Sequence, residues 1–205
     1  KAIGRRDEDY WTWKHERNPF GPSVMLLAEC DGRLVGVRAF MRWRLAFGTQ
    51  TIEAAKPVDT VTHPEYQRRG IFSRLTIQAC DDARAEGIRL IFNTPNQNSK
   101  PGYLKLGWSE VAGLPLYARW LRPIGTAWTV LRRKLGVRRP VDPDAFFRKP
   151  PTPAGQLFDG QWQLETLLET QDFPERLQTR RSVPFLRWRY ARHPHIPYCV
   201  ETLGT

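Results

Sequence analysis

The residues of this chain best suited to chemistry form a basic turn that ends in a glycine. Residues 67–70 are Gln-Arg-Arg-Gly; they follow a β-like run and precede an amphipathic helical pattern. The first backbone N–H groups of a helix have no partner within the helix, and the helix dipole places positive charge at the same end. These donors, with the charges of Arg68 and Arg69, predict a binding site for a phosphate group around Gly70.

A second group of polar and aromatic residues lies further along the chain. Residues 96–108 are Asn-Gln-Asn-Ser-Lys-Pro-Gly-Tyr-Leu-Lys-Leu-Gly-Trp. A helix predicted over residues 70–86 and a β-like run over residues 88–93 separate this segment from the basic turn. Four apolar residues recur in the helix at the spacing of one face, which we expect to pack on a sheet: Phe72, Leu75, Ala79 and Ala83.

Antiparallel strands are expected to precede the basic turn. Asp31-Gly32 is a strong signal for a two-residue hairpin turn, and the run after it alternates apolar side chains. The alternating residues, predicted on one face, are Val35, Val37, Ala39 and Met41. The predicted elements are a helix over residues 7–17, strands over 23–30, 33–47 and 57–62, the helix over 70–86 and a strand over 88–93.

In its basic turn and its second polar segment the chain resembles the GNAT superfamily of N-acyltransferases, which use acyl-coenzyme A. The pyrophosphate loop of that family has Gln or Arg, two variable residues, Gly, one variable residue and then Gly or Ala; here Phe72 takes the last position. The family's later pattern, whose first aromatic residue is replaced by Gly102, is matched in register by Asn96, Ser99, Tyr103, Lys105, Leu106, Gly107 and Trp108. The resemblance covers residues 59–108 and depends on both elements occurring in order.

The resemblance implies an α/β (α+β) fold, with a mixed and mostly antiparallel central sheet, flanking helices and a V-shaped opening for acyl-CoA. The backbone of residues 68–71 would bind the pyrophosphate of acetyl-CoA or another acyl-CoA, and the edge of residues 58–62 would pair with the pantetheine amides. A backbone N–H near Val61 would polarise the thioester carbonyl. The implied cofactor-binding residues are Val61, Thr62, Gln67, Arg68, Arg69, Gly70, Ile71, Asn96, Ser99 and Tyr103.

The resemblance also implies that an amine attacks the thioester directly. Tyr103 matches the tyrosine that donates a proton to the coenzyme A thiolate, although an aromatic residue packed at a helix start is the other interpretation. Asn96 would hydrogen-bond the cofactor or brace its loop.

The candidate general base is Asp59. It lies two residues before Val61 on the cofactor strand, so both side chains are expected on the same side. A carboxylate there would accept the proton of the amine, directly or through water. A structural Asp that holds a neighbouring turn is the other interpretation, and His63 and Glu53 are further candidates for the base.

The chain of 205 residues has a net charge of +11, which favours anionic partners. Most of this charge lies in residues 115–150, where nine Lys and Arg outnumber two Asp (9 − 2 = +7). Proline-rich composition predicts a linker over residues 123–157 with a possible short basic helix. Arg132, Arg133 and Lys134 would contact an acidic membrane or another polyanion weakly, or the segment is a solvated connector. No specific nucleic-acid motif is present.

Three cysteines, Cys30, Cys80 and Cys199, are odd in number and widely spaced, and no metal-binding spacing occurs. This usage predicts a reducing, cytoplasmic location. No apolar stretch approaches the roughly 20 residues of a membrane-spanning helix.

The sequence also predicts an internal repeat. Residues 10–19 and 185–194 share aromatic, Trp, basic and Pro positions at one fixed offset, and each is followed by a β-like segment. Chance similarity between two aromatic-basic helices is the alternative. The predicted domains are a GNAT-like acyltransferase domain over 1–122, the linker over 123–157, and the start of a second related domain or a C-terminal subdomain over 158–205.

Two classes of function follow. The first is an acyl-CoA-dependent N-acyltransferase that transfers an acyl group, expected to be acetyl, to a primary amine. The second is a non-catalytic binding module of the same fold that contacts acidic lipid or another polyanion through its basic segment. No side-chain pattern identifies the acceptor.

Overall fold

A computed structural model of the protein describes residues 7–113, 152–159, 161–169 and 176–200. Residues 1–108 and 152–205 form one compact unit, and residues 109–151 form a second. Most of the predicted linker, including its basic residues, lies outside the described residues, so the predicted contact with a polyanion stays a prediction.

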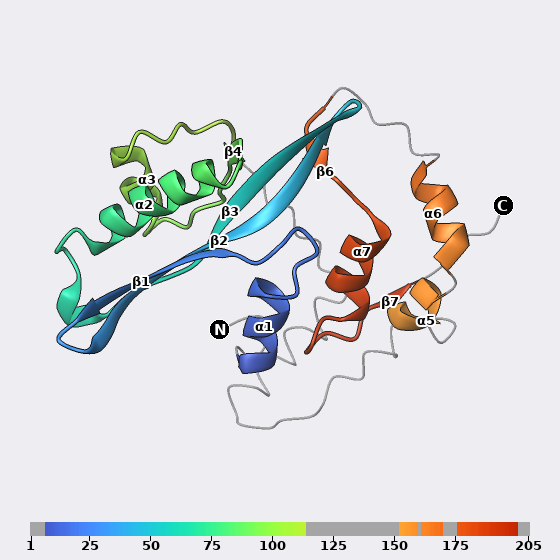
Figure 1. Cartoon of the computed structure of the whole chain (residues 1–205), viewed down its shortest axis with the longest axis horizontal. Helices are drawn as coiled ribbons and strands as arrows, with labels where there is room; N and C mark the ends of the chain where they lie inside the picture. Colours follow the sequence, from blue (N-terminus) through green and yellow to red (C-terminus); the bar gives the residue numbers. More distant parts are fainter. Residues whose placement is uncertain (1–6, 114–151, 160, 170–175, 201–205) are drawn as a thin grey trace, which may run out of the picture. The chain divides into compact units, whose positions relative to one another are not determined.

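The described residues form short helices around one long hairpin (Figure 1). The elements are α1 (Glu8–His15), β1 (Val24–Cys30), β2 (Arg33–Phe47), β3 (Gln50–Thr62), the 3₁₀ turn η1 (Pro64–Tyr66), α2 (Ile71–Ala85), β4 (Leu90–Ile91), α3 (Lys100–Lys105), β5 (Thr152–Pro153), α5 (Ala154–Asp159), α6 (Gln161–Glu169), β6 (Gln178–Thr179), α7 (Val183–Leu186), the π-helical turn η3 (Arg187–Ala191) and β7 (Cys199–Val200). The order predicted for residues 7–93 is confirmed.

Two of the predicted strands differ in length. β3 begins at Gln50 rather than at residue 57, because it pairs with β2 along almost its whole length. β4 contains only two residues, because it pairs with β3 only at Ala54 and Ala55.

The main sheet has the order β1-β2-β3-β4, with β6 beside β2 beyond the end of β1. Its pairs are antiparallel except for β3 and β4, which run parallel. Asp31 and Gly32 make the predicted hairpin turn, with φ of 51° and 72°. Such left-handed values are what a two-residue hairpin loop requires. The mixed, mostly antiparallel sheet with flanking helices agrees with the predicted fold class.

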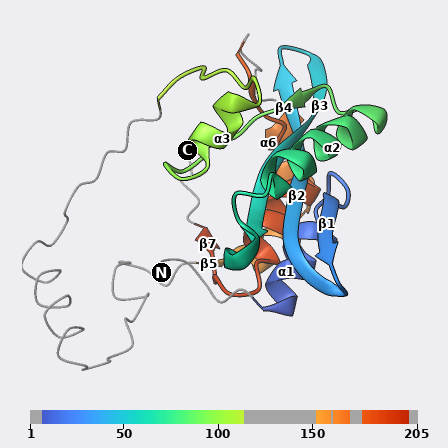
Figure 2. The same cartoon turned by 90° about the vertical axis from the view of Figure 1, so that its left-hand side faces the viewer.

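Helix α2 packs on one face of the sheet (Figure 2). Ala79 and Ala83, two of the helix residues predicted to face the sheet, are buried there against Phe40. Phe72 and Leu75 are only partly buried, but both lie against β2: the Phe72 ring is 5.1 Å from the Arg38 guanidinium, and Leu75 reaches Gly36. The predicted face is therefore confirmed, and Ile71 and Thr76 are further buried positions. The core on this face consists of Val24, Phe40, Ala55, Ala79, Ala83 and Ile88.

The opposite face of the sheet is covered by α1 and α7. The aromatic core there consists of Trp13, Phe20, Met41, Phe185 and Trp188. Because helices cover both faces, β2 buries neighbouring residues on opposite sides, Phe40 towards α2 and Met41 towards the aromatic core. The sequence predicted one apolar face for β2, whereas both faces of this strand are buried.

A reciprocal tryptophan pair joins the C-terminal segment to α1. Trp13 Nε1 donates to the carbonyl oxygen of Trp188 at 2.8 Å, and Trp188 Nε1 donates to that of Trp13 at 2.7 Å. The two rings stack with centroids 4.7 Å apart. The residues are separated by 175 positions, which is also the interval of the predicted repeat (185 − 10 = 175).

The helix caps recur at the same interval. Asp7 accepts from the N–H of Tyr10 at the start of α1, and Ser182 accepts from the N–H of Phe185 at the start of α7. A wide turn closes α1, from Arg17 N to Thr12 O, and another closes η3, from Arg192 N to Arg187 O, both at 2.9 Å. The two segments thus share local structure, and whether residues 158–205 begin a second related domain stays a prediction.

Candidate functional site

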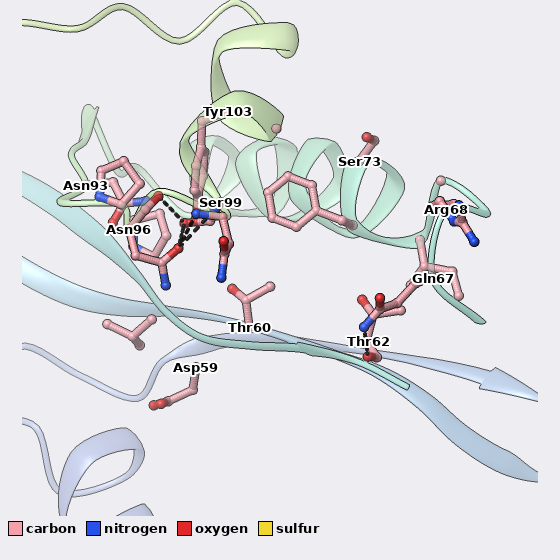
Figure 3. Close-up of a pocket in the computed structure, with 18 of the residues that line it drawn as sticks. Asp59, Thr60, Thr62, Gln67, Arg68, Ser73, Asn93, Asn96, Ser99 and Tyr103 are labelled. Atoms are coloured by element: carbon pink, nitrogen blue, oxygen red, sulfur yellow. Dashed lines mark hydrogen bonds between the residues drawn. The ribbon is translucent and has the colours of Figure 1, made fainter. Parts of the chain in front are cut away.

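A cavity of about 760 Å³ lies between β3, the start of α2 and the loop before α3 (Figure 3). Its volume is in the range of a cofactor-sized site. The predicted site residues that line it are Asp59, Thr62, Gln67, Arg68, Gly70, Ile71, Asn96, Ser99 and Tyr103. Two others do not line it: the Arg69 guanidinium lies 4.7 Å from the centre of the Tyr66 ring, and Val61 lines a second cavity.

One edge of β3 is open along this cavity. The parallel pairing with β4 stops at Ala55 and Ile91, and the N–H of Phe92 bonds to the carbonyl of Ala55 at 3.1 Å. From there on, within the described ranges, β3 is paired only with β2, and its residues 57–60 line the cavity. An open strand edge offers N–H and C=O groups to an extended ligand. The resemblance predicted a V-shaped opening without saying which strands form it.

The start of α2 lies at the far end of the same cavity. Gly70 has φ of 76° and provides no side-chain cap, and its carbonyl accepts from Arg74 N at 3.0 Å. The helix N–H groups before Arg74, from Ile71 to Ser73, have no partner by helix geometry. They supply donors and positive potential where a phosphate group was predicted.

β3 carries a bulge beside the cavity. Asp59 and Thr60 both stand opposite Arg38 in the pairing with β2. Asp59 has φ of 41°, a left-handed value that is uncommon for a residue with a side chain, and such strain concentrates at functional sites. The bulge sends Thr60 towards Tyr103 and Asp59 to the other side of the strand (Figure 3).

Two residues of α1 hold the carboxylate of Asp59. Its Oδ2 lies 3.0 Å from His15 Nε2 and pairs with the Lys14 ammonium, while His15 Nδ1 lies 2.9 Å from Ser23 Oγ. Burial alone would raise the pKa of Asp59, but the hydrogen bonds from His15 and Lys14 and the charge of Lys14 hold it well below its usual value. Asp59 is therefore ionised at neutral pH, and as a general base it is disfavoured.

Tyr103 is both packed and part of the cavity wall. The residue is 4% exposed, and its ring meets Phe72 and Trp108 edge-on, with centroids 5.4 Å and 4.8 Å away. Arg38 Nη2 donates to its hydroxyl at 2.5 Å. The two interpretations offered by the sequence therefore do not exclude each other, because the packing fixes the hydroxyl at the wall.

The two departures from the family pattern meet in space. A Cβ at position 102 would lie 2.8 Å from Cε1 of the Phe72 ring, closer than van der Waals contact permits. The ring thus occupies the space that a side chain at Gly102 would need. Phe72 on α2 is larger than the residue usual at its position, and Gly102 on α3 is smaller, so the two changes compensate each other in volume. Both residues line the cavity.

Asn96 braces the loop before α3. Its Oδ1 accepts from the N–H groups of Asn98 at 3.1 Å and Ser99 at 3.0 Å, and from Ser99 Oγ at 3.1 Å. A side-chain turn of this kind fixes the backbone that leads into the helix of Tyr103. Contact between Asn96 and a cofactor stays a prediction.

The other two candidate bases lie away from the described cavities. Glu53 accepts from Arg44 Nε at 2.7 Å. The ring of His63 packs edge-on against Tyr66 with centroids 5.7 Å apart. Neither residue lines the cofactor-sized cavity or its smaller neighbour.

A second cavity, of about 390 Å³, lies on the α1 side of β3. It shares Asp59 and Thr60 with the larger cavity, so the bulge borders both. Asp59 and Val61 both line it, as their predicted placement on the same side requires. Its walls offer two carboxylates and two aromatic rings, a setting that suits a cation. The lining residues are Asp7, Tyr10, Trp11, Val37, Asp59, Thr60 and Val61.

Sequence reasoning missed three residues that support the site. Arg38 had a signal, because it is the one charged residue in the apolar run Val-Gly-Val-Arg-Ala-Phe-Met of residues 35–41. Lys14 and His15 had none, because their contacts with Asp59 span 45 and 44 residues and depend on how α1 packs.

Two further classes of site are absent from the described residues. No group of three or more His, Cys, Asp or Glu side chains there is placed to hold a metal ion. No helix in those ranges has the length and apolar character needed to cross a membrane.

A search of curated proteins finds no match to the sequence. Among solved structures, the chain is similar to glucosamine-6-phosphate N-acetyltransferase from Arabidopsis thaliana, with 14% identity and a TM-score of 0.40 over 48% of this chain and 66% of that one. An acetyltransferase of Trypanosoma brucei has 24% identity and a TM-score of 0.37 over 45% and 65% of the two chains. A predicted acetyltransferase from Clostridium acetobutylicum, solved with acetyl-CoA, has 18% identity and a TM-score of 0.40 over 45% and 62%. The chain thus spans slightly less than two thirds of each of these structures.

The sequence profile of a family described as an acetyltransferase (GNAT) domain matches residues 1–111. The match covers more than half of the 205 residues (111 of 205). It includes α1, the bulge in β3, the uncapped start of α2 and Tyr103. The chain therefore belongs to the GNAT acetyltransferase family.

Proposed function

We propose that the protein transfers an acyl group, in the first instance acetyl, from coenzyme A to the nitrogen of a primary amine. The observation that carries this proposal is that the open edge of β3, the uncapped start of α2 and the Tyr103 hydroxyl all face one cavity. The strand edge suits the pantetheine amides, the helix start suits the pyrophosphate, and the hydroxyl suits the leaving thiol.

The chemistry assigned to these groups is a direct transfer. The amine nitrogen attacks the thioester carbonyl carbon, the new C–N bond forms, and the C–S bond breaks with its electron pair on sulfur. Tyr103 gives its proton to that sulfur as a general acid. The N–H groups after Gly70 and the side chain of Arg68 anchor the phosphates at the other end of the cofactor.

The acceptor is proposed to enter from the second cavity, because the bulge at Asp59 and Thr60 borders both cavities. The carboxylate of Asp7 and the rings of Tyr10 and Trp11 favour a cationic amine there. Asp59 is paired with Lys14 and its pKa is held low, so it holds the bulge against α1 rather than acting as the proton acceptor. The ammonium gives one proton to water before its nitrogen attacks, and the nitrogen gives a second proton to water as the C–N bond forms.

Thermal unfolding with acetyl-CoA tests the cofactor site. We expect acetyl-CoA to raise the melting temperature of the wild-type protein and to have no effect on Gly70→Glu, whose side chain enters the pyrophosphate site. Gly87→Glu is the matched control: Gly87 follows the other end of α2, has a similar φ of 82°, and has the same open space around its Cβ as Gly70.

Turnover is tested by measuring thiol release from acetyl-CoA across a panel of amines. Tyr103→Phe should slow the best reaction by roughly 10²-fold, which is typical for loss of a general acid, while the melting shift with acetyl-CoA persists. A wild-type protein that acetyl-CoA does not stabilise would refute the proposal. Stabilisation without thiol release from any amine would favour the binding-module alternative.

A further inference from the structure

The guanidinium of Arg38 is wholly buried beside the cofactor-sized cavity. Its exposed fraction is 0%. In the described part of the chain no carboxylate lies within ion-pair distance of it. Removing a charge from water is costly unless the charge is paired and hydrogen-bonded. The position therefore calls for an anion that the resting protein does not supply within these residues.

Only neutral groups contact this cation among the described residues. Nη1 donates to Thr60 Oγ1, and Nη2 donates to Tyr103 Oη at 2.5 Å. Nε has no hydrogen-bond partner in the part of the chain that the structure describes. The guanidinium also lies 5.1 Å from the ring centres of Phe40, Phe72 and Tyr103, whose faces attract a cation but do not neutralise it.

The direction of these bonds decides where the two hydroxyl hydrogens point. A guanidinium can only donate, so the oxygens of Thr60 and Tyr103 are the acceptors. Each hydroxyl hydrogen must therefore turn away from Arg38 towards another acceptor. Both residues line the cavity, and Thr60 lies on the Tyr103 side of β3 (Figure 3). Two O–H donors, each polarised by the same cation, thus face the space proposed for the cofactor.

We infer that Arg38, acting through Thr60 and Tyr103, makes this wall a site that stabilises negative charge on the sulfur as the thioester breaks. This inference rests on the proposed function. The C–S electron pair goes to sulfur, the Tyr103 proton moves to that sulfur, and the phenolate left behind pairs with Arg38. The phenolate then takes up a proton from solvent, which has received one from the attacking amine. Arg38 does not touch the coenzyme and is a positioning residue.

The test measures how strongly the site favours a thiolate, so it needs no acceptor. Free coenzyme A is titrated into the protein by calorimetry at pH 7.5 in two buffers of different ionisation enthalpy, which gives the number of protons released. S-methyl-coenzyme A is the reference, because its thioether cannot ionise. We expect the wild type to make the bound thiol about tenfold more acidic. From an ordinary thiol pKa of about 8.5, that corresponds to release of about 0.4 proton per site.

The variants separate charge stabilisation from packing. Arg38→Met should abolish proton release while S-methyl-coenzyme A still binds within about threefold of wild type, and Arg38→Lys should restore part of the release. Arg44→Met is the matched control on β2, because Arg44 pairs with Glu53 and does not line the cavity. Thr60→Val and Tyr103→Phe each remove one donor and should each lower the release; they decide the question if Arg38→Met does not fold.

The outcomes are distinct. Coenzyme A that binds the wild type without releasing protons, or releases them equally in Arg38→Met, overturns this inference and leaves the proposed function intact. Unchanged release in both Thr60→Val and Tyr103→Phe overturns it as well. If neither compound binds the wild type, the proposed function fails and this inference fails with it.

Discussion

The segment of residues 7–20 and its counterpart at residues 182–195 share their packing but not their chemistry. Each starts with a side-chain cap, ends with a wide turn and places a tryptophan against the other. They differ next to that tryptophan. Lys14 and His15 reach Asp59 at the bulge, whereas the residues 175 positions later are Arg189 and Tyr190. Tyr190 packs edge-on against Tyr198, with ring centroids 5.2 Å apart.

The two segments therefore share the residues that build the aromatic core and differ in the residues that contact the candidate site. Stacked indoles with reciprocal hydrogen bonds bury large apolar area and satisfy both ring N–H groups, and that requires the same residue in both segments. An ion pair at the bulge requires a cation in one segment only. Mutations at equivalent positions can therefore show which features are common to the two segments and which belong to the site.

The largest expected effect is on the shared feature. Trp13→Ala and Trp188→Ala should each lower the free energy of unfolding by about 3–5 kcal/mol, because each removes a buried indole and leaves a carbonyl without its donor. The measurement is urea unfolding of both variants and of the double variant. Strongly unequal losses in the two single variants would show that the two tryptophans are not equivalent. A loss in the double variant well below the sum of the single losses would show that the two residues stabilise the fold through their contact with each other.

An intermediate effect is expected where the segments differ. Lys14→Met should cost about 1–3 kcal/mol at pH 7, because it leaves the mostly buried Asp59 carboxylate without its ammonium. Burial lowers the pKa of Lys56 and of His193, and repulsion by Arg189 lowers both further, for Lys56 after repulsion by Lys14. Because Arg189→Met removes repulsion rather than an attraction, this control variant should be nearly neutral. Equal losses in the two variants would show that the ion pair is not specific to the site.

The pH dependence gives a second measurement on the same pair. The pKa of Asp59 is lower in the folded protein, so its contribution to stability is present above the unfolded value of about 3.9 and is lost as the pH falls towards the folded value. The deficit of Lys14→Met relative to wild type should therefore be constant between pH 5 and 7 and shrink below pH 4. If the deficit in stability does not change down to pH 2.5, the loss in Lys14→Met does not come from its pairing with the Asp59 carboxylate.

The smallest effect is expected at the caps. Ser182→Ala should cost about 1 kcal/mol, the usual value for loss of an N-cap. Asp7→Ala should cost more, because Asp7 also lies 2.9 Å from His195 Nε2. Thermal unfolding of both variants at pH 7 measures the difference, and Asp7→Asn, which keeps a capping oxygen, is the control. A larger loss at Ser182 would contradict the assignment.

Local signals explain why much of the fold was predictable. The Asp31-Gly32 turn needs left-handed backbone that these residue types supply, and the glycine at the start of α2 has the same property. The residues of the cofactor-sized cavity were predictable for the same reason, because Gly70 and Tyr103 lie in short patterns whose order along the chain matches a known family. Nine of the predicted site residues line the cavity, Asp59, Thr62, Gln67, Arg68, Gly70, Ile71, Asn96, Ser99 and Tyr103.

Features that depend on pairing between distant residues were not predictable. The bulge at Asp59 and Thr60 exists only in the register of β3 against β2, so period-two alternation could not show that Asp59 turns towards α1. The pairing of β6 with β2 at Thr179 joins residues more than a hundred positions apart. The compensating sizes of Phe72 and Gly102 were also not predictable, because neither residue by itself indicates that the two are in contact.

The reciprocal tryptophan pair has a consequence for how the chain folds. It closes a loop of 175 residues, and because closure entropy grows with the logarithm of loop length, this costs about 2.5 kcal/mol more than closing a loop of ten residues. During synthesis, the face of Trp13, Phe20 and Met41 stays open to solvent until residue 188 has been made. The family match covers residues 1–111, but the aromatic core of this chain is complete only when Phe185 and Trp188 are added.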